Sequence, residues 1–196
     1  MRQLKLIITA FVLIAPSFAF ADLITFEGLA NQTVVTNQFA GVEFSANSGF
    51  ENQVTTQPGI GFGDNFICTA AIGSAINCTQ ETILTFSSLV NGLSFWQVGD
   101  NASGVVALVD VFVNGAFSAT VDIFGFSDFS TPNLVDLSAF NDVSSIRIYD
   151  VTDPGGLGWD NFEFFPEAES VPEPGTLALL GIGLLGIGAT RRRRKV

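Results

Sequence analysis

Short runs of alternating apolar and polar residues recur through the middle of the chain, from residue 22 to about residue 165. Gly, Asn, Asp and Ser interrupt these runs about every eight to twelve residues, a spacing typical of strands joined by turns. No long stretch keeps the 3.6-residue period of a helix. The pattern therefore predicts an all-β domain over residues 22–165, with strands at 23–27, 42–46, 82–87, 91–98, 105–113, 117–124, 133–138, 144–150 and 159–165.

The clearest hairpin of this domain turns at Asn114 and Gly115. Asn-Gly favours a type I′ turn, in which both central residues take a positive φ. A two-residue turn here pairs Leu108 with Val121, and its register places six apolar side chains on one face, as a layer of a sandwich requires. These residues are Val106, Leu108, Phe112, Phe117, Val121 and Ile123. Asp110 falls on the same face, so either a bulge corrects the register or the carboxylate has a partner.

The chain opens with the three parts of a secretory signal peptide. Two cations precede a short apolar run, and Ala19-Phe20-Ala21 provides an A-x-A cleavage pattern. We therefore expect signal peptidase to remove residues 1–21, so that the mature chain begins at Asp22. The alternative is a membrane anchor, which the shortness of the apolar run disfavours.

The C-terminus has three parts in order. Residues 166–175 form a linker with a Pro-Glu-Pro motif, residues 176–190 are uncharged and mostly apolar, and residues 191–196 hold four arginines and a lysine. A helix over 176–190 would extend about 22 Å, whereas the hydrocarbon core measures about 30 Å. The apolar run alone thus predicts only a short or strained transmembrane helix. The basic tail would stay on the cytoplasmic side, with the domain outside.

This order of Pro-Glu-Pro, apolar helix and Arg cluster resembles the PEP-CTERM sorting signal of Gram-negative bacteria. All three parts match, over residues 171–196. The resemblance implies recognition by a membrane-embedded exosortase, sorting to the cell surface or to the exopolysaccharide matrix of a biofilm, and removal of the tail. The recognition element is then Val171, Pro172, Glu173 and Pro174.

A second resemblance concerns the domain itself. Its last strands, ending in Gly158-Trp159-Asp160-Asn161-Phe162, are similar to the terminal strands of PEP-CTERM passenger domains. Those domains look like the jelly-roll sandwiches of carbohydrate-binding modules and legume-type lectins. The likeness covers about residues 82–165 and implies an antiparallel jelly-roll β-sandwich.

Two cysteines, Cys68 and Cys78, lie in a Gly-rich stretch over residues 47–80 that the pattern leaves without strands. An even cysteine count in an exported chain favours a disulfide. Zinc or redox chemistry is the alternative, but the spacing is not C-x-x-C and the chain has no histidine. We expect the disulfide to hold the stretch as an otherwise flexible insertion.

Charge is distributed unevenly along the chain. Residues 22–170 contain eighteen acidic residues and a single basic one, Arg147, a net charge of −17. Such a domain repels nucleic acid and anionic lipid headgroups, because both are bound through Lys and Arg. It would attract Ca²⁺, which prefers carboxylate and carbonyl oxygens. The alternative is that the charge serves only solubility.

Most catalytic machinery is absent from the sequence. With no histidine, and no lysine between residues 22 and 170, His-based triads and Schiff-base chemistry are excluded. A pair of carboxylates that cleaves a glycosidic bond is the remaining enzymatic alternative.

Two kinds of binding residue remain as candidates. By resemblance to carbohydrate-binding modules, whose first and last strands often meet at a structural Ca²⁺, Glu27 and Asp160 are possible ligands. Asp160 shares the parity of Phe162 and should point inward, unless Asp160 merely makes a turn. Asp150 and Asp153 form a second, looser acidic pair.

Aromatic residues are the other candidates. Trp96, Trp159, Tyr149 and exposed Phe residues could stack on a sugar, and core packing is the alternative. The sequence thus predicts a non-enzymatic, exported sandwich of the cell surface or matrix. A module for matrix polysaccharide is the second hypothesis, and a carboxylate-pair glycoside hydrolase is the third.

Overall fold

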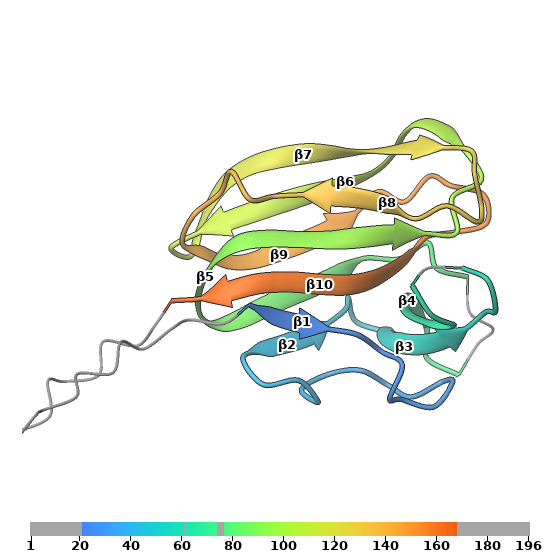
Figure 1. The fold of residues 1–196 in the computed structure, drawn as a ribbon, viewed down its shortest axis with the longest axis horizontal. Coiled ribbons are helices and arrows are strands. Elements are labelled where there is room, and N and C mark those ends of the chain that lie inside the picture. Colours follow the sequence, from blue (N-terminus) through green and yellow to red (C-terminus); the bar gives the residue numbers. More distant parts are fainter. Residues whose placement is uncertain (1–20, 61, 74–76, 168–196) are drawn as a thin grey trace, which may run out of the picture. The chain divides into compact units, whose positions relative to one another are not determined.

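A computed structural model describes residues 21–60, 62–73 and 77–167 (Figure 1). The described residues form antiparallel strands, with no helix among them that is long and apolar enough to cross a membrane. The sorting motif, the apolar run and the basic tail lie outside the described residues, as does all of the signal sequence but Ala21. The strands are β1 (Asp22–Ile24), β2 (Val42–Ser45), β3 (Phe50–Thr56), β4 (Asn65–Ala71), β5 (Thr82–Val98), β6 (Ser103–Val113), β7 (Ala116–Phe126), β8 (Asn133–Asp136), β9 (Val143–Tyr149) and β10 (Gly158–Pro166).

The long strand β5 belongs to both layers of the sandwich. Its first part pairs with β2 and β9, and its last part pairs with β8 and β10. A register shift between Thr85 and Val90 marks the change of layer. The first layer therefore runs β2-β5-β9-β6-β7, and the second runs β8-β5-β10-β4-β3, with β1 also paired to β10. This is the predicted all-β, antiparallel jelly-roll sandwich.

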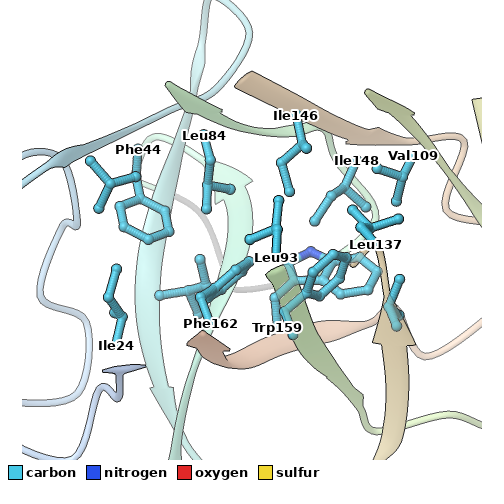
Figure 2. Packing of buried hydrophobic residues seen from close by; sticks show 14 of the residues in the cluster. Ile24, Phe44, Leu84, Leu93, Val109, Leu137, Ile146, Ile148, Trp159 and Phe162 are labelled. Atoms are coloured by element: carbon cyan, nitrogen blue, oxygen red, sulfur yellow. The ribbon is translucent and has the colours of Figure 1, made fainter. Parts of the chain in front are cut away.

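The core lies between these layers, as Figure 2 shows. Leu84, Ile146 and Ile148 of the first layer meet Leu93 and Phe162 of the second, and all five are fully buried. Burying one such side chain contributes about 1.5–3 kcal/mol. The abundance of Phe is explained here, because a chain of buried rings runs through the core at centroid distances of 5.1–5.9 Å: Phe26, Phe44, Phe162 and Phe95.

The β6–β7 hairpin turns where predicted, but its register slips by one residue. Asn114 and Gly115 have φ of 51° and 78°, as a type I′ turn needs. A bulge between Val111 and Phe112 then pairs Val121 with Val109, and the predicted pairing with Leu108 is wrong. Beyond the bulge the predicted apolar face is split between the two sides of the layer. Alternation of residue types cannot reveal a bulge, because the extra residue has no special composition.

Asp110 is the residue that the bulge relocates. It pairs across the ladder with Thr120, and its carboxylate accepts hydrogen bonds from the hydroxyls of Thr120 (2.6 Å) and Tyr149 (3.1 Å). Both solutions that the sequence left open therefore apply, since a bulge corrects the register and the carboxylate has partners.

The stretch that we expected to be a strandless insertion instead forms the hairpin of β3 and β4. Every residue from Asn65 to Ala70 is buried. Ile67 belongs to the main core, whereas Phe66 and Cys68 belong to a second apolar cluster with Ile60 and Val98. A strand covered on both faces loses the alternation on which the prediction depended.

Cys68 and Cys78 form the predicted disulfide, with an S–S distance of 1.96 Å. The bond joins β4 to the segment that precedes β5. Gly156 packs against Cys78 so closely that an added Cβ would lie 2.6 Å from the Cys78 Cβ. The disulfide thus fixes the edge of the second apolar cluster and the loop before β10.

Candidate functional site

Trp96 lies on the outer face of the second layer, half-buried, because its neighbour Phe95 points into the core. The ring of Phe62 meets the Trp96 ring nearly edge-on, with centroids 4.5 Å apart and an angle of 66°. Leu134 of β8 is the cross-strand partner of Trp96. Phe62 is 54% exposed and Leu134 46% exposed. These three side chains make an exposed apolar surface, which we name the Trp96 patch.

A groove of about 240 Å³ adjoins the Trp96 patch through Leu134. It runs between β7 and β8, where the side-chain amide of Asn133 donates to the Phe124 carbonyl at 2.7 Å. Hydrogen bonds from Ser138 lower the pKa of Asp136, so the groove carries negative charge at neutral pH. The groove is lined by Val121, Asp122, Ile123, Phe124, Phe126, Asn133, Leu134, Val135 and Asp136.

Trp159 is not part of this surface. It is 1% exposed, and its ring packs edge-on against Phe95 with centroids 5.8 Å apart. The predicted sugar stacking on Trp159 is therefore wrong. The two tryptophans occupy opposite faces of the same layer, and the sequence offered no sign of which faces outward.

Asp160 is buried, but not by pointing into the main core. It pairs across the ladder with Trp96 and so shares the outer face of the second layer. A register shift after Asp160, with Asn161 at a φ of 46°, breaks the parity with Phe162 that the prediction assumed. The 57–64 loop covers the carboxylate, which is hydrogen-bonded by the backbone N–H groups of Asn161 (2.7 Å) and Phe62.

Glu27, in the turn that follows β1, lies close to Asp160 in the structure. Burial raises the pKa of Asp160 to about 6, and the nearby negative charge of Glu27 raises it further. Glu27 in turn accepts the Asn65 N–H at 3.0 Å. The backbone at Gly63 packs directly on this carboxylate, since an added Cβ would lie 2.0 Å from Glu27 Oε1. The chain thus brings together the two residues predicted as cation ligands.

The fit of this pair to Ca²⁺ is partial. Ca²⁺ takes six to eight oxygen ligands, and within the described residues no group of three or more His, Cys, Asp or Glu side chains gathers. Two carboxylates would therefore need backbone carbonyls and water to complete a shell. Their mutual repulsion in a buried place is nevertheless the condition that a cation relieves.

The second acidic pair does not form a common site. Asp153 is 1% exposed and accepts the backbone N–H groups of Asn101 (2.7 Å) and Gly155 (2.8 Å), so it holds two loops together. Asp150 is exposed and lines a different pocket, described below.

The sequence analysis missed Phe62, Leu134 and the adjoining groove. Phe62 lies in a loop without periodicity, and Leu134 belongs to a strand of four residues. The only available signal was an apolar residue in a short, otherwise polar segment. That signal does not reveal which distant strand lies beside it.

Residues 170–194 match the family model of the PEP-CTERM protein-sorting motif. The predicted sorting signal is thereby confirmed, and the chain carries the tail of an exported protein whose precursor is membrane-anchored. A comparison with curated proteins gives no match.

Several solved structures are similar in fold. One is a low-affinity xylan-binding module, CBM86, from Roseburia intestinalis (11% identity, 74% of this chain and 94% of that chain covered, TM-score 0.32). Another is TmCBM61 in complex with β-1,4-galactotriose (14% identity, 73% and 94% covered, TM-score 0.37). A third contains CBM51-2 in complex with GlcNAc and INT domains from Clostridium perfringens ZmpB (17% identity, 74% and 32% covered, TM-score 0.32).

Proposed function

We propose that the protein is a non-enzymatic carbohydrate-binding module, delivered by its PEP-CTERM tail to the cell surface or to the exopolysaccharide matrix. The observation that carries this proposal is the Trp96 patch. A half-exposed Trp, supported on its edge by an exposed Phe, stands on a rigid sheet rather than in the core. Trp is also the residue type that most often dominates binding energy when a ligand covers it.

The chemistry of the patch suits a sugar. The C–H face of a pyranose can pack on the Trp96 ring, while its hydroxyl groups need polar partners at the rim. Asp122 and Asp136 in the adjoining groove supply carboxylate oxygens that accept hydroxyl hydrogens. Because these groups are anionic, the site favours a neutral polysaccharide over one rich in uronic acids.

The described residues offer little support for catalysis. Asp160 has the raised pKa that a general acid needs, yet it is 1% exposed beneath the loop that carries Phe62, so a glycosidic oxygen cannot reach it. Its neighbour Glu27 is bound to the Asn65 N–H. This pair therefore favours the binding module over the glycoside hydrolase.

We propose that a Ca²⁺ ion held by Glu27 and Asp160 stabilises the patch from below. The loop that covers both carboxylates also carries Phe62, so an ion there would fix the aromatic pair. When bound, the ion would supply positive charge to two carboxylates that otherwise repel each other. Binding of glycan would then weaken when Ca²⁺ is removed.

Processing completes the proposed route. Signal peptidase would cut after Ala21, and an exosortase would act at Val171-Pro172-Glu173-Pro174 in a Gram-negative cell. Mass spectrometry of the surface-located protein checks both steps. A species that begins at Asp22 and ends near Ser170 or Pro172 is expected, and retention of the Arg cluster would mean a plain membrane anchor.

A glycan array tests the binding function. The full chain, kept soluble in mild detergent, is applied to neutral and acidic matrix polysaccharides, in Ca²⁺ and in EDTA. We expect saturable binding to a neutral polysaccharide, weakened by EDTA. If no glycan is bound under either condition, the protein is not a carbohydrate-binding module and a structural role remains.

A further inference from the structure

The outer face of the first layer has a pocket of its own, remote in the fold from the Trp96 patch because the two lie on opposite layers. Its volume is about 310 Å³, near the lower end of the range for small-molecule sites. It is open and mostly polar, and is lined by Asn47, Thr79, Gln80, Glu81, Arg147, Tyr149 and Asp150.

Arg147 is the centre of this pocket and the single cation of residues 22–170. Its guanidinium lies over the Tyr149 ring, 4.4 Å from the centroid. One arm donates to Glu81 Oε2 at 2.7 Å, and the other lies 3.6 Å from Asp110 Oδ2. These contacts hold the planar group in one orientation while its side chain remains 40% exposed. A guanidinium has five N–H donors, so several remain available to a ligand.

Glu81 supplies the complementary group. Its side chain is only 9% exposed, and its Oε2 accepts from both Asn47 (3.0 Å) and Arg147. Its second oxygen, Oε1, accepts no hydrogen bond from the described residues. A fixed donor and a fixed acceptor therefore stand side by side on a rigid sheet. Adjacent hydroxyls of a sugar, each of which can donate and accept, match such a pair.

The charge of the pocket narrows the ligand class. Glu81, Asp110 and Asp150 surround the one cation, so the formal charge of the group is negative. Anionic ligands such as uronates or sulfated sugars are therefore repelled. A metal cation alone is also disfavoured, because the guanidinium occupies the position between the carboxylates.

We propose that this pocket is a second carbohydrate site, which recognises the vicinal hydroxyls of a neutral sugar through Arg147 and Glu81. The site does not depend on the Trp96 patch. If both sites operate, one molecule can hold two glycan segments on opposite layers and join matrix chains.

The test is an NMR titration of the isotope-labelled full chain in detergent micelles. The probes are the methyl glycosides of glucose, galactose, mannose and xylose, with methyl glucuronoside as the charged counterpart. We expect at least one neutral glycoside to shift the Arg147 Nε–H and Gln80 amide signals saturably. We expect the glucuronoside to bind at least tenfold more weakly than that neutral glycoside.

Three variants separate this site from the other. Arg147→Lys keeps the positive charge but loses the planar fork, and Gln80→Ala trims the pocket wall without touching the main core. Both should weaken binding at these signals, Arg147→Lys by at least tenfold. Trp96→Ala should leave the same titration unchanged, even if it abolishes binding at the Trp96 patch.

Two results would overturn the proposal. One is that none of the four neutral glycosides shifts the pocket signals. The other is that Arg147→Lys and Gln80→Ala both bind like the unaltered chain. Either result leaves the Trp96 patch untouched, so failure here can be told apart from failure of the proposed function.

Discussion

At the scale of single residues, Asp160 is the side chain whose protonation depends most on its surroundings. Its pKa in the folded protein is about 6, against an ordinary value of 3.8, because burial penalises the charged form. The folded state therefore holds the proton more tightly than the unfolded state. The resulting stabilisation is complete below about pH 4 and is lost as the pH rises through 6.

Asp160→Asn should remove this pH dependence. In EDTA, the free energy of unfolding should fall between pH 4 and pH 7 by on the order of 3 kcal/mol more in the original chain than in the variant. Urea denaturation at several pH values measures it, with exposed Asp122→Asn as the control. An identical pH profile for Asp160→Asn and the original chain would show that the buried carboxylate does not titrate as described.

Addition of Ca²⁺ tests the same residue in a different way. At a concentration one hundred times its Kd, a bound ion adds about 2.7 kcal/mol to the free energy of unfolding. We expect that gain in the original chain near pH 7.5, and little of it in Asp160→Asn or Glu27→Gln. A thermal melt that Ca²⁺ does not shift would remove the ion from the account.

Phe162 gives a prediction for the core. It is fully buried and its ring contacts those of Phe26, Phe44 and Phe95. Phe162→Ala should cost about 3–5 kcal/mol of stability, whereas Phe126→Ala, at a 69% exposed position, should change it by no more than about 0.5 kcal/mol. Chemical denaturation compares them, and similar losses for both variants would contradict the assigned burial.

At the scale of elements, the disulfide holds β4 and the segment before β5 together. It closes a loop with a sequence separation of 10 residues, which the chain-entropy model values at about 3 kcal/mol. The double variant Cys68→Ala, Cys78→Ala should lose about this much stability, measured by urea denaturation. Reduction of the original chain should give the same loss, and no change on reduction would show that the bond is not needed.

The elements that the sequence revealed are those with one buried face. The turn at Asn114 and the alternation in β9 were legible because each side chain had a single environment. The hidden features have a common cause. β4 is buried on both faces, and the bulges in β6 and β10 insert residues that nothing in the composition marks.

The candidate site was legible to the same extent. Trp96 and the pairing of Glu27 with Asp160 could be proposed, since aromatic and acidic residues announce their chemistry. The burial of Trp159 and the contact of Phe62 with Trp96 could not, because both depend on which strand lies beside which.

At the scale of the whole molecule, the arrangement of charge and the sorting signal bear on one another. The tail holds five of the eight cations, whereas residues 22–170 have a net charge of −17. Removal of such a tail would leave a polyanionic sandwich with little attraction to anionic lipid. A neutral polysaccharide would then be the partner that this surface does not repel.

The most direct test of the central claim is the affinity of the Trp96→Ala variant for the neutral polysaccharide selected on the array. Isothermal titration should show binding at least tenfold weaker than that of the original chain, a loss of about 1.4 kcal/mol. Phe117→Ala removes an aromatic ring that is 60% exposed on the other layer, and it should bind normally. Unchanged affinity in Trp96→Ala would contradict the assignment of this surface as the carbohydrate site.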